Sequence, residues 1–435
     1  MLKNTIIQQK LEKEGFLNRT YIPREKLNAF KPVLSSDLIK VITGPRRAGK
    51  SVFAFLLLKD EDFAYVNFDD EALLKPDNYD AVLAALLEVY PRSKYILFDE
   101  IQNLDKWEVF ISKLHRRGYN LVLTGSNAHL LSSELASALT GRYAAVEILP
   151  FSFREFLLAR NFQPAQTEAS PEAKAKLLNL LEEYLRQGGY PEVTTKNLEV
   201  KPYLQTLFDA LLLKDVVKRF RVRYTQQIYD LAQYLMAHFA AEFSYNKLRN
   251  ALGLRSTATV EKYAHYLKEA YLLYALNRFS HKFKEQLKAP KKAYFVDNGF
   301  LTAKAFQISP NSGRLMENAV FIELIRRGYV PNDGIFYYKT RNNKEVDFIL
   351  RRGTKTESLI QVCMDLDSEG ARKREQNALI EAGEELDCSR LIILSWDTEA
   401  QESVKGGKVD IVPLWKWLLQ GAQDFNRACP RRDYP

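Results

Sequence analysis

A short glycine-containing loop between a strand pattern and a helix pattern constrains this chain more than any other feature. Residues 38–43 read as a buried strand, and a helix is expected from about Lys50 onward. The loop GPRRAGKS at 44–51 matches the pattern GxxxxGK(S/T). Such a loop cradles phosphate oxygens with successive backbone N–H groups at the amino end of a helix. The sequence therefore predicts an ATP-binding loop of the Walker A type.

The Walker A pattern assigns a role to each part of the loop. The glycines permit close approach to the phosphates, Lys50 is expected to reach the β- and γ-phosphates, and the Ser51 hydroxyl is expected to hold Mg²⁺. A chance match of the string is the competing interpretation, and the placement between a strand and a helix argues against it. The residues predicted to bind the nucleotide are Gly44, Pro45, Arg46, Arg47, Ala48, Gly49, Lys50 and Ser51.

Two carboxylates follow a second apolar strand pattern at 94–100, where YILFDE has the form of a Walker B motif. Asp99 is predicted to hold Mg²⁺ together with Ser51, and Glu100 is predicted to polarise the attacking water. Phosphoryl transfer favours this division because positioning and charge stabilisation dominate its catalysis. Without the Walker A motif, the two residues would be interpreted as a surface Asp-Glu pair at the end of a strand.

The next strand pattern, 120–127, ends in Ser126 and Asn127. Ligands of α/β folds bind at the carboxyl ends of parallel strands, so either side chain could orient the water or sense the γ-phosphate, and Asn127 is favoured. Arg142 follows in the segment LTGRY. It is predicted to act as an arginine finger in a neighbouring subunit, and a structural ion pair is the alternative.

The alternation of strands and helices over 38–127 predicts a parallel sheet with crossover helices. Residues 236–300 show two helices separated by GLRS and then two short strands around a basic loop at 279–292, the order of a winged helix-turn-helix. From about Gly313 we expect a helix, two strands joined at Asn342 and Asn343, a third strand, a helix and another strand.

Five segments carry a family resemblance. GPRRAGKS, ILFDEIQ, LTGSN, LTGRY and LPFSFREF, in this order, resemble the AAA-type (AAA+) P-loop ATPases of archaea and bacteria that carry a C-terminal nuclease-like domain of unknown function. The resemblance covers nearly the whole chain and implies ATP hydrolysis. The implied domains are an AAA+-like ATPase core (1–160), a helical linker or lid (161–235), a winged helix-turn-helix (236–300) and a restriction-endonuclease-like α/β domain (301–435).

The basic middle of the chain indicates an anionic partner. Residues 201–300 carry 17 Lys/Arg against 8 Asp/Glu, which accounts for the whole formal charge of +9. Winged helices contact DNA phosphates through such residues. The alternative is a lid or protein-docking module in which His265, Tyr263, Tyr266 and Tyr271 are ordinary core. The expected DNA-facing residues are Arg255, Ser256, Thr257, Thr259 and Lys262 on the second helix and Arg278, Lys282, Lys284, Lys288, Lys291 and Lys292 on the wing.

The C-terminal region matches the nuclease pattern only in part. Restriction-type nucleases place a helix Glu, a strand Asp and an E-x-K motif around Mg²⁺. Here Glu317 and Asp347 are present, but the E-x-K has become Gln361-Val362-Cys363. The loss of one carboxylate and of the lysine predicts an inactive module, although Glu345 could partly replace the carboxylate. A catalytic role for the Cys363 thiol is a third interpretation. The alternative is an inert side chain, because a cysteine on a buried strand usually behaves as a small hydrophobic residue.

Composition excludes several classes of protein. The chain has 435 residues, of which 46% are hydrophobic and 27% charged, as in globular proteins. No stretch approaches the roughly 20 apolar residues that span a bilayer, so a cytoplasmic protein without membrane contact is expected. Cys363, Cys388 and Cys429 lack zinc-ligand spacing.

Three functional hypotheses follow. The first is an ATPase that couples hydrolysis to a DNA-contacting winged helix and nuclease-like module. The second is a slow nucleotide-dependent switch or scaffold that acts on a protein partner or on further copies of itself, and the third is an ATP-linked nuclease.

Overall fold

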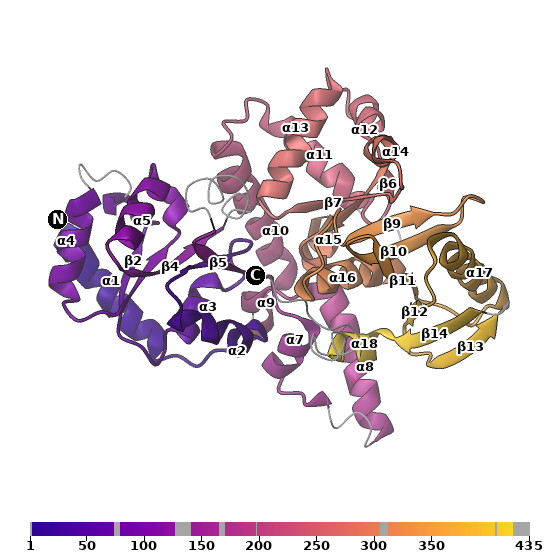
Figure 1. Cartoon of the computed structure of the whole chain (residues 1–435), viewed down its shortest axis with the longest axis horizontal. Coiled ribbons are helices and arrows are strands. Elements are labelled where there is room, and N and C mark those ends of the chain that lie inside the picture. Colours follow the sequence, from indigo (N-terminus) through magenta and orange to yellow (C-terminus); the bar gives the residue numbers. More distant parts are fainter. Residues whose placement is uncertain are drawn as a thin grey trace. The chain divides into compact units, whose positions relative to one another are not determined.

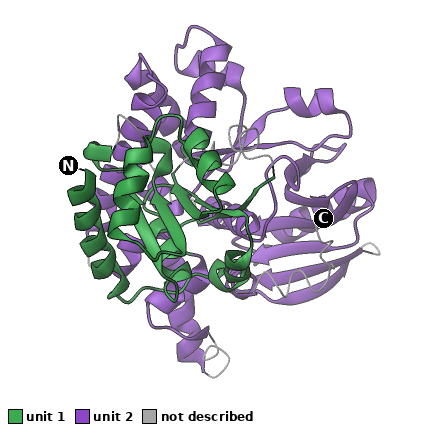
Figure 2. Cartoon of the chain, turned by 60° about the vertical axis from the view of Figure 1, so that its left-hand side comes forward, with its two compact units in different colours: residues 1–151, 269–271 green, residues 152–268, 272–435 purple. Residues whose placement is uncertain are grey.

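The computed structural model describes residues 2–73, 79–126, 141–164, 170–196, 198–304, 312–404 and 407–420. The chain divides into two compact units, coloured separately in Figure 2. Unit 1 contains residues 1–151 and 269–271, and unit 2 contains residues 152–268 and 272–435.

Unit 1 is built on a five-stranded sheet in the order β2-β3-β4-β1-β5, with all neighbouring strands parallel (Figure 1). The parallel sheet predicted from the sequence is therefore confirmed. The edge strand β5 was not anticipated from the sequence. The strands are β1 (Ile39–Thr43), β2 (Phe63–Asn67), β3 (Tyr95–Asp99), β4 (Asn120–Gly125) and β5 (Tyr143–Glu147).

Helices cover both faces of this sheet, because successive strand residues point to opposite sides. Val41 and Phe98 pack into one core with α1, α4 and α5, whereas Ile42 and Leu97 pack into the other with α2 and α3. Burial on both faces explains why these strands are continuous apolar runs. The helices are α1 (Leu2–Leu17), α2 (Lys26–Phe30), α3 (Lys50–Leu57), α4 (Tyr79–Val89) and α5 (Trp107–Arg116), with short 3₁₀ turns η1 (Lys31–Ser35), η2 (Glu71–Leu73) and η3 (Ile101–Asn103).

Unit 2 begins with helices. The first starts at a capping box, in which Ser152 and Glu155 each accept a hydrogen bond from the other's backbone N–H. As expected, the helix after Ser170 ends at Gly188, whose φ is 76°. The helices are α7 (Phe153–Ala159), α8 (Pro171–Gln187), α9 (Pro191–Thr195), α10 (Val200–Leu211), the π-helical η6 (Leu212–Lys218) and α11 (Thr225–Ala237).

A small antiparallel sheet follows, in the order β6-β8-β7. The connection between β7 and β8, expected as a basic loop, carries the short helix α14. The side chains of Phe283 and Leu287 on this helix are exposed to solvent. The elements are β6 (Glu242–Phe243), α12 (Tyr245–Ala251), α13 (Thr257–Glu269), β7 (Leu273–Asn277), α14 (Phe283–Lys288) and β8 (Lys291–Phe295).

The C-terminal part of unit 2 is a six-stranded mixed sheet in the order β13-β14-β12-β11-β10-β9 (Figure 1). β11, β12 and β14 are parallel, and the remaining pairs are antiparallel. The predicted hairpin at Asn342 and Asn343 is confirmed, with Asn343 in the left-handed region at φ 60°. Strands β13 and β14 were not anticipated.

The elements of this part are α15 (Asn298–Lys304), α16 (Ser312–Arg326), β9 (Ile335–Lys339), β10 (Glu345–Arg352), β11 (Lys355–Cys363), α17 (Glu369–Leu386), β12 (Leu391–Ser395), β13 (Ala400–Val404), β14 (Gly407–Pro413) and α18 (Leu414–Leu419). Across the described ranges, no helix combines the length and apolarity needed to cross a membrane.

Candidate functional site

The loop after β1 has the backbone conformation that its glycines permit. Gly44 has a φ of 138°, and a Cβ there would overlap the carbonyl oxygen of Ile148. Gly49 precedes α3 with a φ of 92°, and Arg47 also lies in the left-handed region at 66°. Side chains other than glycine rarely adopt such values, so the loop shape depends on these positions.

Lys50 lies at the start of α3 with only 4% of its surface exposed. Its ammonium group donates to the Pro45 carbonyl oxygen at 3.1 Å and lies 3.6 Å from Oε1 of Glu100. A buried ammonium requires a counter-charge, and Glu100 supplies it. The Walker A lysine and the second Walker B carboxylate therefore meet in one enclosed site.

Asp99, at the end of β3, is surrounded by hydroxyl donors. Ser51 Oγ donates to its Oδ1 at 2.9 Å, Tyr65 donates to its Oδ2 at 3.2 Å, and Thr124 also donates to Oδ1. The two residues predicted to share Mg²⁺, Ser51 and Asp99, are thus in direct contact. Tyr65 and Thr124 were missed from the sequence because they come from β2 and β4, which meet β3 only in the folded sheet.

Glu100 adopts a left-handed conformation with φ 51°. Its backbone N–H donates to Thr124 Oγ1 at 3.1 Å, and its Oε2 accepts hydrogen bonds from Ser126 Oγ at 3.1 Å and from the Gln102 amide. These donors fix the carboxylate beside Lys50. Gln102 was not singled out from the sequence, although its place two residues after Glu100 in ILFDEIQ was the available signal.

The electrostatics of the pair fit a bound cation. Burial and the neighbouring Glu100 raise the pKa of Asp99 above its usual value, although Thr124 and Ser51 oppose this. For Glu100, burial alone would raise the pKa, but Lys50 and Arg46 outweigh it and hold the pKa low. Asp99 and Glu100 are two buried carboxylates side by side, and a divalent ion held by Ser51 and Asp99 would offset the repulsion between them.

Arg24 supports the loop from outside the motif. This buried arginine donates to the carbonyl oxygens of Ala48, at 2.8 Å, and of Leu149. It therefore ties the phosphate loop to the segment after β5. Nothing in the local sequence around Arg24 predicts this role, because both partners are distant in the chain.

For two predicted catalytic residues, Asn127 and Arg142, the described part of the chain shows no contact with the phosphate loop. Asn127 lies outside the described residues, and the neighbouring Ser126 provides the contact to Glu100. Arg142 is exposed and immediately precedes β5. Since β5 is parallel to β1, Arg142 lies at the amino edge of the sheet, whereas the loop follows the carboxyl end of β1. An arginine-finger role thus requires a second copy of the chain.

The basic region presents most of its predicted DNA-facing residues to solvent. Arg255, Lys262 and the wing lysines at 282, 284 and 288 are exposed. Ser256 caps α13, because its Oγ accepts from the Thr259 N–H at 3.1 Å. The prediction that Lys292 lines the wing surface is wrong: it is only 1% exposed. Adjacent strand residues point to opposite faces, so Lys292 turns inward while Lys291 donates to Asn277 Oδ1.

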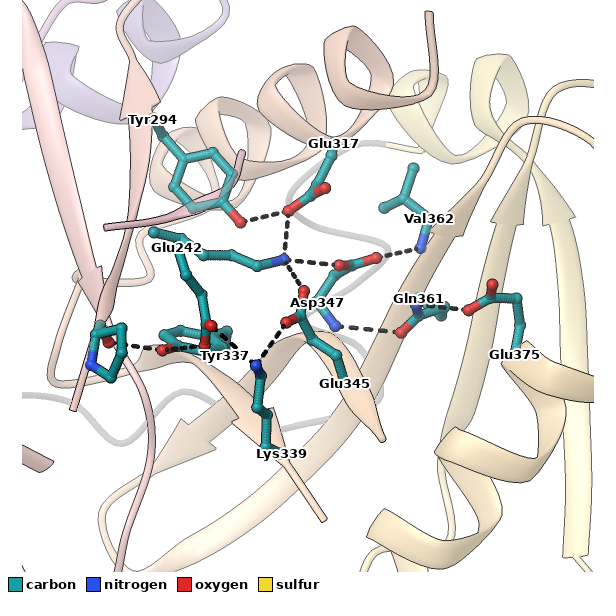
Figure 3. Close-up of polar contacts among 12 residues, drawn as sticks. Glu242, Tyr294, Glu317, Tyr337, Lys339, Glu345, Asp347, Gln361, Val362 and Glu375 are labelled. Atoms are coloured by element: carbon teal, nitrogen blue, oxygen red, sulfur yellow. Dashed lines mark hydrogen bonds and ion pairs between the residues drawn. The ribbon is translucent and has the colours of Figure 1, made fainter. Parts of the chain in front are cut away.

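The nuclease-pattern residues form a second buried cluster, in unit 2. Glu317 on α16 and Asp347 on β10 come together there (Figure 3). Lys292 Nζ lies 2.9 Å from Glu317 Oε1 and from Asp347 Oδ1. Gln361 forms its hydrogen bonds with other partners than Lys292. Its Oε1 accepts from the Asp347 N–H at 3.2 Å, and its Nε2 donates to Glu375 at 2.7 Å.

Cys363 has the environment of an unreactive thiol. Its Sγ donates to the Asp365 carbonyl oxygen at 3.1 Å, and burial raises the pKa of the thiol to about 11. The thiolate is the nucleophilic form, so this shift opposes a catalytic role.

Three family models match the chain in succession. Residues 36–157 match an AAA domain, residues 178–311 match a domain of unknown function (DUF8612), and residues 312–417 match a second domain of unknown function (DUF4143). The AAA match contains every residue of the loop and both Walker B carboxylates.

Two curated relatives extend over most of the chain. The uncharacterized protein MJ1544 of Methanocaldococcus jannaschii is 38% identical over 404 residues, which cover 89% of each chain. An uncharacterized protein of Haemophilus influenzae is 30% identical over 93% of this chain and 100% of its own length.

Solved structures give weaker likenesses. The Walker-type ATPase PABY2304 of Pyrococcus abyssi aligns with 65% of this chain and 95% of its own at 14% identity and a TM-score of 0.42. The ORC1 protein of Aeropyrum pernix, solved in complex with DNA, covers 72% of this chain and 97% of its own at 12% identity and a TM-score of 0.32.

The AAA-domain match and the parallel-sheet core agree on an AAA-type ATPase domain in unit 1. Over most of its length, the chain belongs to the same family as the uncharacterized protein MJ1544 of Methanocaldococcus jannaschii and the uncharacterized protein of Haemophilus influenzae.

Proposed function

We propose that this protein is a Mg²⁺-dependent ATPase that uses ATP hydrolysis to move a DNA-contacting winged helix together with its C-terminal module. The observation that carries the proposal is the single enclosed cluster of Lys50, Ser51, Asp99 and Glu100. Such a cluster unites a phosphate-binding cation, two oxygen groups suited to Mg²⁺ and a carboxylate able to polarise water.

Each part of this site would have its own role in ATP binding and hydrolysis. The backbone N–H groups of the loop from Gly44 to Ser51 would hold the phosphates, and Lys50 would place its charge on the β- and γ-phosphates. Ser51 and Asp99 would hold Mg²⁺, which supplies charge neutralisation when bound. Glu100 would orient water, positioned by Ser126 and Gln102. Arg142 would serve the site of a neighbouring copy.

The element order α11, β6, α12, α13, β7, α14, β8 supports the winged-helix interpretation of residues 236–300. The exposed lysines at 282, 284 and 288 are suited to phosphate contacts, because a chain that neutralises phosphates releases counterions on binding. DNA is therefore the partner that we propose for this region.

Replacing Lys282, Lys284 and Lys288 together by glutamine is expected to flatten the salt dependence of duplex DNA binding. Each lost phosphate contact should reduce the log–log slope by about 0.9. Fluorescence anisotropy with a labelled duplex between about 50 and 200 mM salt measures that slope. The matched control replaces three exposed lysines elsewhere, Lys59, Lys355 and Lys408, and should leave the slope unchanged. If both triple variants showed the same salt-dependence slope, the wing lysines would be excluded as contacts to the DNA phosphates.

An ATPase assay with and without duplex DNA separates the first hypothesis from the nucleotide-dependent switch. Stimulation of turnover by DNA supports coupling to a DNA-contacting module. Turnover that is slow and indifferent to DNA favours a switch or scaffold with a protein partner.

The ATP-linked nuclease is disfavoured by the contacts of Glu317 and Asp347, which are already made to Lys292. We expect supercoiled plasmid to remain intact with the wild-type chain, ATP and Mg²⁺. Nicking by the wild type that disappears in Asp347→Ala would instead establish the nuclease.

A further inference from the structure

A divalent metal does not fit the C-terminal carboxylate cluster. A nuclease site of this kind needs carboxylate oxygens with free lone pairs that face one open position. Three carboxylates do converge here from different elements: Glu317 from α16, and Glu345 and Asp347 from β10 (Figure 3). Their common partner is a lysine of the preceding small sheet.

Lys292 of β8 makes three short contacts with these carboxylates. Its Nζ lies 2.9 Å from Glu317 Oε1, 2.8 Å from Glu345 Oε1 and 2.9 Å from Asp347 Oδ1. The ammonium donates hydrogen bonds to Glu317 and Asp347 and forms an ion pair with Glu345, so three carboxylates surround a group that has donors and no acceptor. Although burial alone would lower the pKa of Lys292, Asp347 and Glu317 raise it well above its usual value, so the side chain is charged.

Two of the three other carboxylate oxygens, Asp347 Oδ2 and Glu345 Oε2, also have partners. Asp347 Oδ2 accepts from the Val362 N–H at 3.0 Å, and Glu317 Oε1 accepts a second hydrogen bond from the Tyr294 hydroxyl at 2.6 Å. Glu345 Oε2 lies 3.6 Å from the ammonium of Lys339. Among the described residues, no group of three or more His, Cys, Asp or Glu side chains is arranged to hold a metal ion.

We propose that the Lys292 ammonium takes the place of the divalent cation in this module, so that the carboxylate cluster is an internal ion-pair network that binds no metal. A lysine of the same chain neutralises the carboxylates in every folded molecule, whereas the occupancy of a metal site depends on the concentration of the free ion. This inference is independent of the ATP site and of the proposed DNA contact.

The network also fastens two sheets together. Glu242 of β6 lies 2.9 Å from Lys339 of β9, and the Asn318 side chain of α16 exchanges two hydrogen bonds with the backbone of Phe295 on β8, at 2.8 and 3.0 Å. The Glu242–Lys339 pair and the contacts of Lys292 with β10 join the β6-β8-β7 sheet to the six-stranded sheet, and the Asn318 contact joins β8 to α16. A movement of one sheet would therefore carry the other with it.

Mn²⁺ uptake by the full chain without nucleotide, measured by electron paramagnetic resonance, tests the proposal. Wild type and Asp347→Asn should take up the same number of ions. Lys292→Met, which keeps the aliphatic stem and removes the charge, should take up one more, and Lys292→Met/Asp347→Asn should return to the wild-type number. Lys291→Met, at the neighbouring β8 position, is the matched control and should behave as wild type.

Thermal unfolding gives a second measurement. Lys292→Met should lower the midpoint by about 10 °C, because the buried carboxylates lose their partner. Mn²⁺ should recover part of this loss in Lys292→Met and none in the double variant. Two results overturn the proposal: one more Mn²⁺ on wild type than on Asp347→Asn, or no added ion on folded Lys292→Met. If Lys292→Met fails to fold, the comparison of wild type with Asp347→Asn decides alone.

Discussion

Glu100→Gln is expected to bind ATP and to lose turnover by about 10²- to 10⁴-fold, the contribution typical of a positioned general base. The amide keeps the shape of the carboxylate and its place beside Ser126 and Lys50, but it cannot polarise water as an anion does. Because one negative charge near the phosphates disappears, ATP affinity should stay equal or rise. Phosphate release and the anisotropy of a fluorescent ATP analogue measure the two effects separately.

The matched control for this substitution is Glu88→Gln, which removes an exposed carboxylate that pairs with Lys3 on the surface of unit 1. It should leave both turnover and affinity at the wild-type values, since exposed ion pairs contribute little. Unchanged turnover in Glu100→Gln would exclude Glu100 as the residue that activates water.

Lys50→Ala is expected to weaken ATP binding by about 30- to 4000-fold, because truncating one partner of a buried, hydrogen-bonded charge pair costs about 2 to 5 kcal/mol. The loss arises from the missing ammonium contact to the phosphates. Turnover at accessible ATP concentrations should fall below detection. Titration calorimetry with ATP and Mg²⁺ measures the affinity directly.

Two controls make the Lys50 result interpretable. Lys59→Ala removes an exposed lysine just after α3 and should bind ATP normally. Circular dichroism must show that Lys50→Ala is folded, because Asp99 and Glu100 lose their buried cation in that variant. A folded Lys50→Ala that hydrolyses ATP like the wild type would contradict the whole assignment of the nucleotide site.

The sequence was informative about unit 1 because its signals are local. The strand before Gly44, the helix from Lys50 and the strand that ends at Asp99 were each predicted within a residue or two of their observed bounds. The contacts of Thr124, Tyr65 and Arg24 could not be predicted. The contacts of Thr124 and Tyr65 depend on which strand lies beside which, and the contacts of Arg24 depend on two loops that are distant in the chain.

The wing illustrates a different limit. Lys291 and Lys292 are adjacent residues of the same type, and both were predicted from the sequence to line a DNA-facing surface. The alternation of side chains along β8 separates them, and a register that differed by one residue would have buried the other lysine. Sequence charge alone therefore cannot distinguish a phosphate contact from an internal ion pair.

The phosphate-binding loop and its helix are specified by consecutive residues of the chain. Consecutive residues make that site, and the glycines at 44 and 49 and the lysine at 50 specify it without reference to the rest of the chain. The cation that pairs with the second carboxylate cluster, in contrast, depends on how the chain folds. Glu317, Asp347 and Lys292 come from three separate elements, and Lys292 reaches the cluster because β8 packs beside α16 and β10. A buried charge is stable only with its counter-charges in place, and that pairing is a property of the folded chain.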